Sequence, residues 1–210
     1  MKVFCIGRNK TGTTSLSSAL KGLGYIMGSQ RSGELLIRDW INNDFTNILN
    51  LVNTADAFQD IPFSYDNTYE ELDKHFPNSK FILSIRDSPE EWYDSLVRFH
   101  SKMFGKGKIP TAQQLKNSNH VWKGWIYEAM YNLYKTTEND PYNKEILINH
   151  YENYNNKVIS YFKDRPDDLL VINLKNKNSY LDFCEFLGKE PKLNNFPHLN
   201  KSKKTISNTK

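Results

Sequence analysis

A short apolar segment and the polar loop after it restrict the fold of this chain more than any other stretch. Residues 3–6 are Val-Phe-Cys-Ile, an apolar run typical of a buried strand. Beyond the loop over 7–15, Gly24 stands where a helix-ending glycine is expected, and apolar residues recur before it at helical spacing: Leu16, Ala19, Leu20 and Leu23. A strand, a tight loop and a helix in this order bring backbone amides and a helix N-terminus together, which predicts a phosphate site.

The position of the lysine in this loop limits the kind of phosphate ligand. The loop of nucleoside triphosphatases has the pattern G-x-x-x-x-G-K-[ST], with the lysine directly after the second glycine. Gly7 and Gly12 have this separation, but Thr13 takes the place of the lysine, and Lys10 comes two residues before Gly12. We therefore expect a ligand with a single phosphate held by amides, hydroxyls and Lys10, and not a phosphate chain with magnesium. The alternative is an ordinary turn with a solvated lysine.

A second strand, loop and helix follow in the middle of the chain. Residues 80–85 form a nearly continuous apolar run, typical of a strand covered on both faces. The run ends at Arg86, and Ser88 and Glu91 then provide the capping box of a helix that starts with a proline. We expect this helix to carry Ser95 at the edge of its core stripe, which consists of Trp92, Leu96, Phe99 and Met103.

Strands and helices alternate along the remaining chain. Brief buried strands are expected within 55–61 and over 169–174, and helices over about 70–76, 120–136, 144–162 and from a Ser179 cap to Leu187. This alternation predicts an α/β fold, a three-layer arrangement with a parallel sheet flanked by helices. Ligands of such sheets bind beyond the carboxyl ends of the strands, where both informative loops and Asp60 are expected.

The size and charge of the chain narrow its class. With 210 residues it suits one domain, which we place at 1–204, followed by a flexible tail over 205–210. A net charge of +4 fits a small polyanionic ligand and falls short of the basic face of a nucleic-acid-binding protein. Cys5 and Cys184 indicate buried thiols in a reducing compartment. Without an apolar run of about 18 residues or a signal-like start, we expect a cytoplasmic protein that does not insert into membranes.

Taken together, these motifs resemble the sulfotransferases that use 3′-phosphoadenylyl sulfate. Residues 10–16, Lys-Thr-Gly-Thr-Thr-Ser-Leu, are similar to the family's loop for the 5′-phosphate, and Arg86 with Ser95 is similar to its 3′-phosphate motif. Three further segments resemble a compact, largely microbial branch: 165–170, 186–188 and 196–201. The resemblance covers nearly the whole chain and implies a P-loop NTPase-like sulfotransferase fold with 3′-phosphoadenylyl sulfate as co-substrate.

The same resemblance implies which residues bind this donor. They come from the first loop and from the second motif: Arg8, Asn9, Lys10, Thr11, Gly12, Thr13, Thr14, Ser15, Arg86 and Ser95. No cluster of His, Cys and acidic residues has the spacing of metal ligands, so no metal is expected.

Sulfuryl transfer also needs a cation and a base. The reaction is an in-line displacement with a phosphate as leaving group, so a cation is needed at the bridging oxygen, and Lys10 is the candidate. By resemblance, a base stands at a strand end in a His-x-Pro setting, where this chain has Asp60 in Gln-Asp-Ile-Pro. The alternatives are that Asp60 is structural, and that His100, near the predicted nucleotide helix, is the base.

The acceptor is the least defined part of this prediction. We expect a hydroxyl, less readily an amine, on a small-molecule or glycan-like acceptor, with some helix aromatics lining its pocket. Two other functions remain open. One is a P-loop kinase of small molecules, and the other is a catalytically inactive nucleotide-binding protein that would keep Lys10 and Arg86 without needing Asp60.

Overall fold

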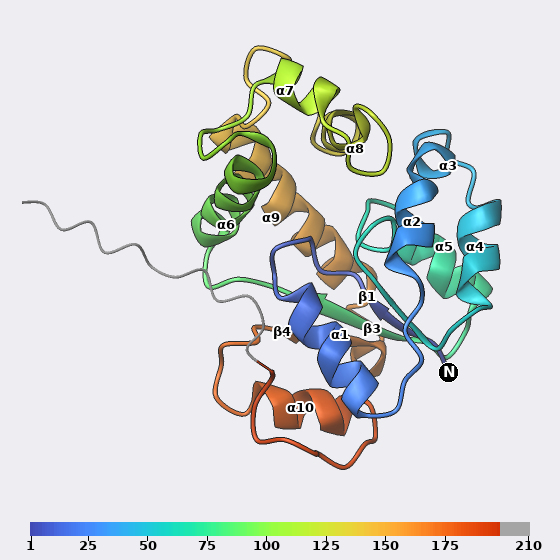
Figure 1. Ribbon diagram of the computed structural model, residues 1–210. Coiled ribbons are helices and arrows are strands. Elements are labelled where there is room, and N and C mark those ends of the chain that lie inside the picture. The colour runs from blue at the N-terminus through green and yellow to red at the C-terminus, as the bar shows by residue number, and fades with distance from the viewer. Residues whose placement is uncertain (198–210) are drawn as a thin grey trace, which may run out of the picture.

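A computed structural model describes residues 1–197 as a parallel sheet with helices on both faces (Figure 1). The strands lie in the order β2 (Ala57–Gln59), β1 (Val3–Cys5), β3 (Lys80–Ser84) and β4 (Leu169–Ile172), and every neighbouring pair is parallel. The prediction of an α/β fold with a flanked parallel sheet is therefore confirmed. The motif residues from 198 to 201, the expected domain end at 204 and the expected tail over 205–210 lie outside the described residues.

The helices connect and cover these strands. A single 3₁₀ turn, Pro166–Asp168, precedes β4. In chain order the α-helices are α1 Thr13–Gly22, α2 Gln30–Leu35, α3 Ile37–Ile41, α4 Thr46–Val52, α5 Thr68–His75, α6 Pro89–Phe104, α7 Ala112–Asn117, α8 Trp125–Tyr134, α9 Lys144–Tyr161 and α10 Ser179–Phe186.

Both faces of the sheet are buried, because consecutive residues of a strand point to opposite sides. Val3 belongs to a core formed with α1 and α10, whereas Phe4 belongs to a core formed with α4, α5 and α9. Cys5 and Cys184 both lie in the first of these cores, and burial raises the pKa of the Cys5 thiol to about 12. Both cysteines are thus buried free thiols, as predicted.

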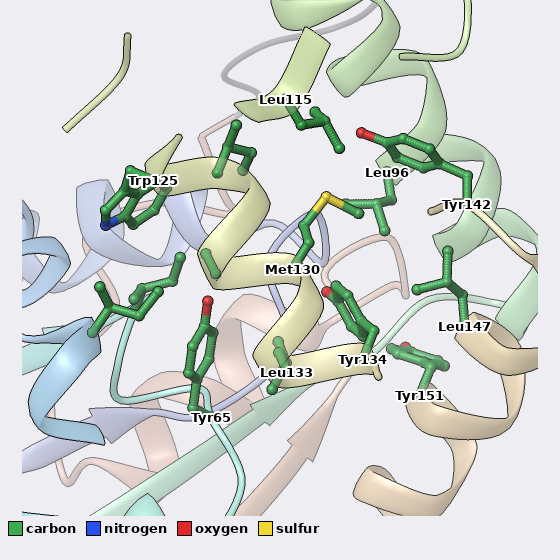
Figure 2. Close-up of a cluster of buried hydrophobic side chains, with 14 of the residues drawn as sticks. Tyr65, Leu96, Leu115, Trp125, Met130, Leu133, Tyr134, Tyr142, Leu147 and Tyr151 are labelled. Atoms are coloured by element: carbon green, nitrogen blue, oxygen red, sulfur yellow. The ribbon is translucent and has the colours of Figure 1, made fainter. Parts of the chain in front are cut away.

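A third core joins α6, α7, α8 and α9 away from the sheet (Figure 2). Trp125, Met130 and Tyr134 of α8 are buried there, and the ring of Trp92 stacks on Tyr151 with centroids 4.6 Å apart. The aromatic residues of these helices therefore fill mainly a core, as their helical spacing predicts.

Two predicted helix starts are wrong, and one short helix was not predicted. The helix expected from 120 begins only at Trp125, because Gly124 at its N-cap has a φ of 83°. The preceding loop contains α7, which starts with a capping box between Thr111 and Gln114. Ser179 is the first residue of α10 and not its cap, and its hydroxyl donates to the carbonyl of Leu174 at 3.3 Å.

Candidate active site

The loop between β1 and α1 is anchored to β3 at its first glycine. A Cβ at Gly7 would lie 2.2 Å from Ser84 Oγ, so only glycine allows this approach. The Thr11 hydroxyl lies 2.6 Å from Ser84 Oγ and donates to the Arg8 carbonyl at 2.6 Å. The loop therefore has a fixed shape on the carboxyl end of β3.

The second glycine positions the start of α1. Gly12 has a φ of 107°, and a Cβ there would lie 2.8 Å from Leu174 Cδ2. No side chain within residues 1–197 caps the helix that follows, whose first turn contains Thr13, Thr14 and Ser15. Free N–H groups and hydroxyls at a helix N-terminus favour an anion at this point.

Lys10 lies in the same loop with an unusual backbone. Its φ is 69°, in the left-handed region, and its Nζ lies 3.5 Å from the centroid of the Phe99 ring on α6. Burial lowers the pKa of Lys10, and Arg86 and Arg98 lower it further, whereas the charge of Asp60 acts in the opposite direction. Lys10 thus lies in a partly desolvated position between α6 and Asp60.

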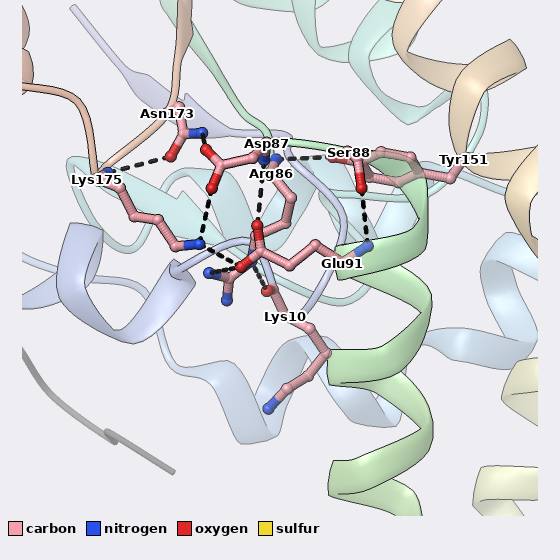
Figure 3. Close-up of polar contacts among 8 residues, drawn as sticks. All are labelled: Lys10, Arg86, Asp87, Ser88, Glu91, Tyr151, Asn173 and Lys175. Atoms are coloured by element: carbon pink, nitrogen blue, oxygen red, sulfur yellow. Dashed lines mark hydrogen bonds and ion pairs between the residues drawn. The ribbon is translucent and has the colours of Figure 1, made fainter. Parts of the chain in front are cut away.

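The start of α6 is bound to the backbone of this loop. Arg86 Nε donates to the Lys10 carbonyl at 2.7 Å, and Trp92 Nε1 donates to the Asn9 carbonyl at 3.0 Å (Figure 3 shows Arg86 and Lys10). Ser88 caps the helix by accepting from the Glu91 amide at 3.1 Å, as predicted. The Glu91 carboxylate does not complete the capping box, because it accepts from the Asp87 amide at 3.4 Å and not from the Ser88 amide, and it also pairs with Arg86 at 3.5 Å. The first loop and the segment from Arg86 into α6, which are the two motifs predicted to bind phosphates, are therefore in direct contact.

Ser95 lies on the face of α6 that is directed at the loop. It follows Trp92 by three residues and precedes Phe99 by four, and both of these rings contact the loop. Residues at this spacing share one face of a helix. Ser95 is buried on this face, between the two residues that contact the loop, and its role as a ligand of the 3′-phosphate stays a prediction.

Asp60 follows β2 and lies beside Lys10 and Thr13. Its φ is 62°, and its Oδ1 accepts from the Ile61 amide at 3.1 Å. Burial raises the pKa of Asp60 to about 6, and the charge of Glu34 acts in the same direction. The pKa does not rise further because the ionised carboxylate is stabilised by the Ile61 amide, by the charge of Lys10 and by a hydrogen bond from Thr13. A carboxyl that titrates near neutral pH suits a general base.

A family model described as a sulfotransferase domain matches residues 2–205 of the chain. The chain belongs to this sulfotransferase family. A comparison with curated proteins finds no match. Family membership supports transfer of a sulfuryl group by this enzyme in general terms. Across residues 1–197 of the sulfotransferase, no helix is long and apolar enough to cross a membrane, and no three metal-ligating side chains gather.

The Arg8 side chain of the sulfotransferase is directed at α9 and at the segment after β2. Its side chain is 1% exposed, its guanidinium binds Asp66 and the Ser64 carbonyl, and it stacks on the Tyr154 ring at 3.6 Å. His150 Nε2 lies 2.6 Å from Arg8 Nη2 and must accept this hydrogen bond, in line with a pKa that burial and Arg8 lower to about 3. The Arg8 side chain thus joins β1 to α9 and to the segment after β2, and its assignment as a donor ligand stays a prediction.

His100 is a core residue of the sulfotransferase. It is 2% exposed, its Nδ1 lies 2.9 Å from the Tyr142 hydroxyl, and its ring meets Phe104 edge-on. Burial, together with the charge of Lys10, lowers the pKa of His100 to about 3. A histidine that holds a proton this weakly, and whose Nδ1 is occupied, is a poorer base than Asp60.

Sequence reasoning missed Glu34, a second acidic residue on the Asp60 side. A Cβ at Gly33 would lie 2.6 Å from the Ile61 carbonyl, so α2 packs directly on the residue after Asp60. Glu34 is buried, and its carboxylate accepts hydrogen bonds from Gln30 Nε2 at 3.2 Å and from Arg31 Nη1 at 3.4 Å. No local pattern marks Glu34, because its burial depends on packing against residues far along the chain.

Proposed function

We propose that this sulfotransferase transfers the sulfuryl group from 3′-phosphoadenylyl sulfate to a hydroxyl, less readily an amine, of a small or glycan-like acceptor. The choice of 3′-phosphoadenylyl sulfate as donor rests on one observation. Arg86 Nε donates a hydrogen bond to the Lys10 carbonyl at 2.7 Å. This hydrogen bond holds the first loop, which suits a single phosphate, next to Arg86, which suits a second phosphate. Two separate phosphates, and not a phosphate chain, are the feature that distinguishes this donor from a nucleoside triphosphate.

Each phosphate would be held by groups of a different kind. Amides at the start of α1 and the hydroxyls of Thr13 and Thr14 would bind the 5′-phosphate, where the helix N-terminus favours negative charge. Arg86 and Ser95 would bind the 3′-phosphate, and a guanidinium suits this role because it can hold two phosphate oxygens at once.

The transfer step exchanges one bond to sulfur for another. The bond between sulfur and the bridging phosphate oxygen breaks, and the acceptor oxygen forms the new bond to sulfur. Lys10 would leave the Phe99 ring and stabilise the charge that develops on the bridging oxygen. The acceptor loses its proton to Asp60, whose pKa near 6 leaves it ionised at neutral pH and still able to hold a proton.

The two alternatives are less consistent with these residues. A kinase of the P-loop type places its lysine after the second glycine, where this chain has Thr13. An inactive nucleotide-binding protein would not need a partly buried carboxyl with a raised pKa beside Lys10, and such a group raises the free energy of the native state.

Titration calorimetry with adenosine 3′,5′-bisphosphate, and separately with ATP and magnesium, tests this proposal. We expect the bisphosphate to bind more tightly than ATP with magnesium, and the reverse preference would refute the sulfotransferase donor. Asp60→Asn should bind the bisphosphate like the wild type but transfer no label from 3′-phosphoadenylyl [³⁵S]sulfate to an acceptor found by a library screen.

A further inference from the structure

The loop after β4 brings a lysine close to Gly12 and to the start of α6. Leu174 packs against Gly12, where a Cβ would lie 2.8 Å from Leu174 Cδ2. The next residue, Lys175, is exposed and reaches the start of α6. Lys175 belongs to none of the motifs in the sequence, yet it stands next to the predicted phosphate ligands.

Two cations share one carboxylate at this point (Figure 3). Glu91 Oε1 lies 3.5 Å from Arg86 Nη1 and also accepts a hydrogen bond from Lys175 Nζ. The cations come from different elements, one after β3 and the other after β4, and the carboxylate lies in the first turn of α6. The Glu91 carboxylate of the protein itself therefore occupies an anion position between Arg86 and Lys175.

Each cation also has a second partner that does not depend on Glu91. Arg86 Nε donates to the Lys10 carbonyl at 2.7 Å, and Lys175 Nζ donates to Asp87 Oδ2 at 2.9 Å. The Asp87 carboxylate is in turn held by the side-chain amide of Asn173, whereas the Asp87 backbone amide donates to Glu91 Oε2 at 3.4 Å and would lose this partner. If the Glu91 carboxylate left, both cations would stay in place with a free anion position between them.

We propose that Glu91 occupies, in the donor-free protein, the position that the donor's second phosphate takes on binding, and that Lys175 is a further donor-binding residue. This inference rests on the proposed function, which assigns the second phosphate to Arg86. A phosphate monoester offers more charge and more acceptor oxygens than a carboxylate, so it can displace one from a pair of cations. The Glu91 side chain is 32% exposed and can turn into solvent when displaced.

Glu91→Gln provides the first test, with Glu90→Gln as the matched control in the same helical turn. Ser88 caps α6 through the Glu91 backbone amide, so the glutamine variant keeps this cap. Removing one competing surface ion pair should tighten adenosine 3′,5′-bisphosphate binding about two- to fivefold by calorimetry. Adenosine 5′-phosphate, which lacks the second phosphate, should bind both variants like the wild type.

Lys175→Ala provides the second test, with Lys177→Ala as a control two residues further along the same loop. We expect Lys175→Ala to weaken bisphosphate binding about fivefold, roughly the loss of one exposed charge contact, and to leave 5′-phosphate binding unchanged. Lys177→Ala should change neither dissociation constant.

The possible outcomes separate this inference from the proposed function. If the wild type bound the bisphosphate but Glu91→Gln bound it equally or more weakly, Glu91 would not compete with phosphate and the inference would be wrong. An unchanged dissociation constant for Lys175→Ala would equally exclude Lys175 as a ligand. If the wild type bound the bisphosphate no better than the 5′-phosphate, or bound neither, both the inference and the proposed function would be refuted.

Discussion

Asp60→Asn should make the protein more stable at the same time as it abolishes transfer. The carboxyl of Asp60 has an ordinary pKa of 3.8, and burial raises it to about 6 in the folded chain. Because the folded state binds the proton more tightly than the unfolded state, Asp60 favours folding at low pH and opposes it once both states are ionised. Asparagine carries no charge to bury, and its Oδ1 can still accept from the Ile61 amide.

The size of this effect follows from the two pKa values. A difference of one pKa unit corresponds to about 1.4 kcal/mol, so ionised Asp60 lowers the free energy of unfolding by roughly 3 kcal/mol at pH 8. At pH 5 the carboxyl is mostly protonated in the folded state, and Asp60 then lowers the free energy of unfolding by only about half as much as at pH 8. The variant should therefore gain more stability at pH 8 than at pH 5.

Urea unfolding of the wild type and of Asp60→Asn at both pH values measures this difference. Asp94→Asn, a substitution of an exposed carboxylate on α6, is the control and should show no such pH dependence. Transfer by the wild type should fall about tenfold for each pH unit below 6, since the protonated carboxyl cannot act as a base. An Asp60→Asn variant that is less stable than the wild type at pH 8, or that keeps full transfer, would refute the reasoning.

Three further predictions concern residues around this site. Lys10→Ala should lower kcat about 10²- to 10³-fold while changing the dissociation constant of the bisphosphate much less, which kinetics and calorimetry would separate; equal losses in both would contradict a role in the transition state. Glu34→Gln should lower the pKa of Asp60 by removing a neighbouring negative charge, so the acid limb of the pH profile of kcat/KM should move to lower pH; a uniform loss at all pH values would indicate a structural role. Arg8→Met should cost about 3 kcal/mol in urea unfolding, because it leaves Asp66 and buried polar groups without their partner; a change below about 1 kcal/mol would argue against the structural role of Arg8.

The features that the sequence predicted well are those encoded by neighbouring residues. The glycines of the first loop, the apolar run before Arg86 and the Ser88 cap each act over a few positions, and the structure has the expected elements there. The capping box of α7, formed by Thr111 and Gln114, is equally local, but no helix was predicted at these residues.

The parts that could not be predicted depend on contacts between distant positions. Arg8 directly follows Gly7, and nothing local indicates that its guanidinium turns to Asp66 and His150, 58 and 142 positions away. Glu34 is buried only because α2 packs on the residue after Asp60. Lys175 contacts Glu91 across 84 positions. Such pairs follow from the order of the strands, which a single sequence leaves open.

The left-handed backbone conformation of Lys10 and Asp60 affects which substitutions would stabilise the protein at these two positions. Both residues have a φ near 60–70°, a conformation that glycine adopts freely, that aspartate and asparagine tolerate, and that costs lysine about 1 kcal/mol. Selection for stability alone would therefore favour glycine or asparagine in place of Lys10, and an uncharged residue of the same kind in place of Asp60, whose ionised carboxyl opposes folding. It would remove the cation and the carboxyl together. A laboratory selection for heat resistance should accumulate glycine or asparagine at these two positions, whereas a selection that also requires transfer should retain lysine and aspartate.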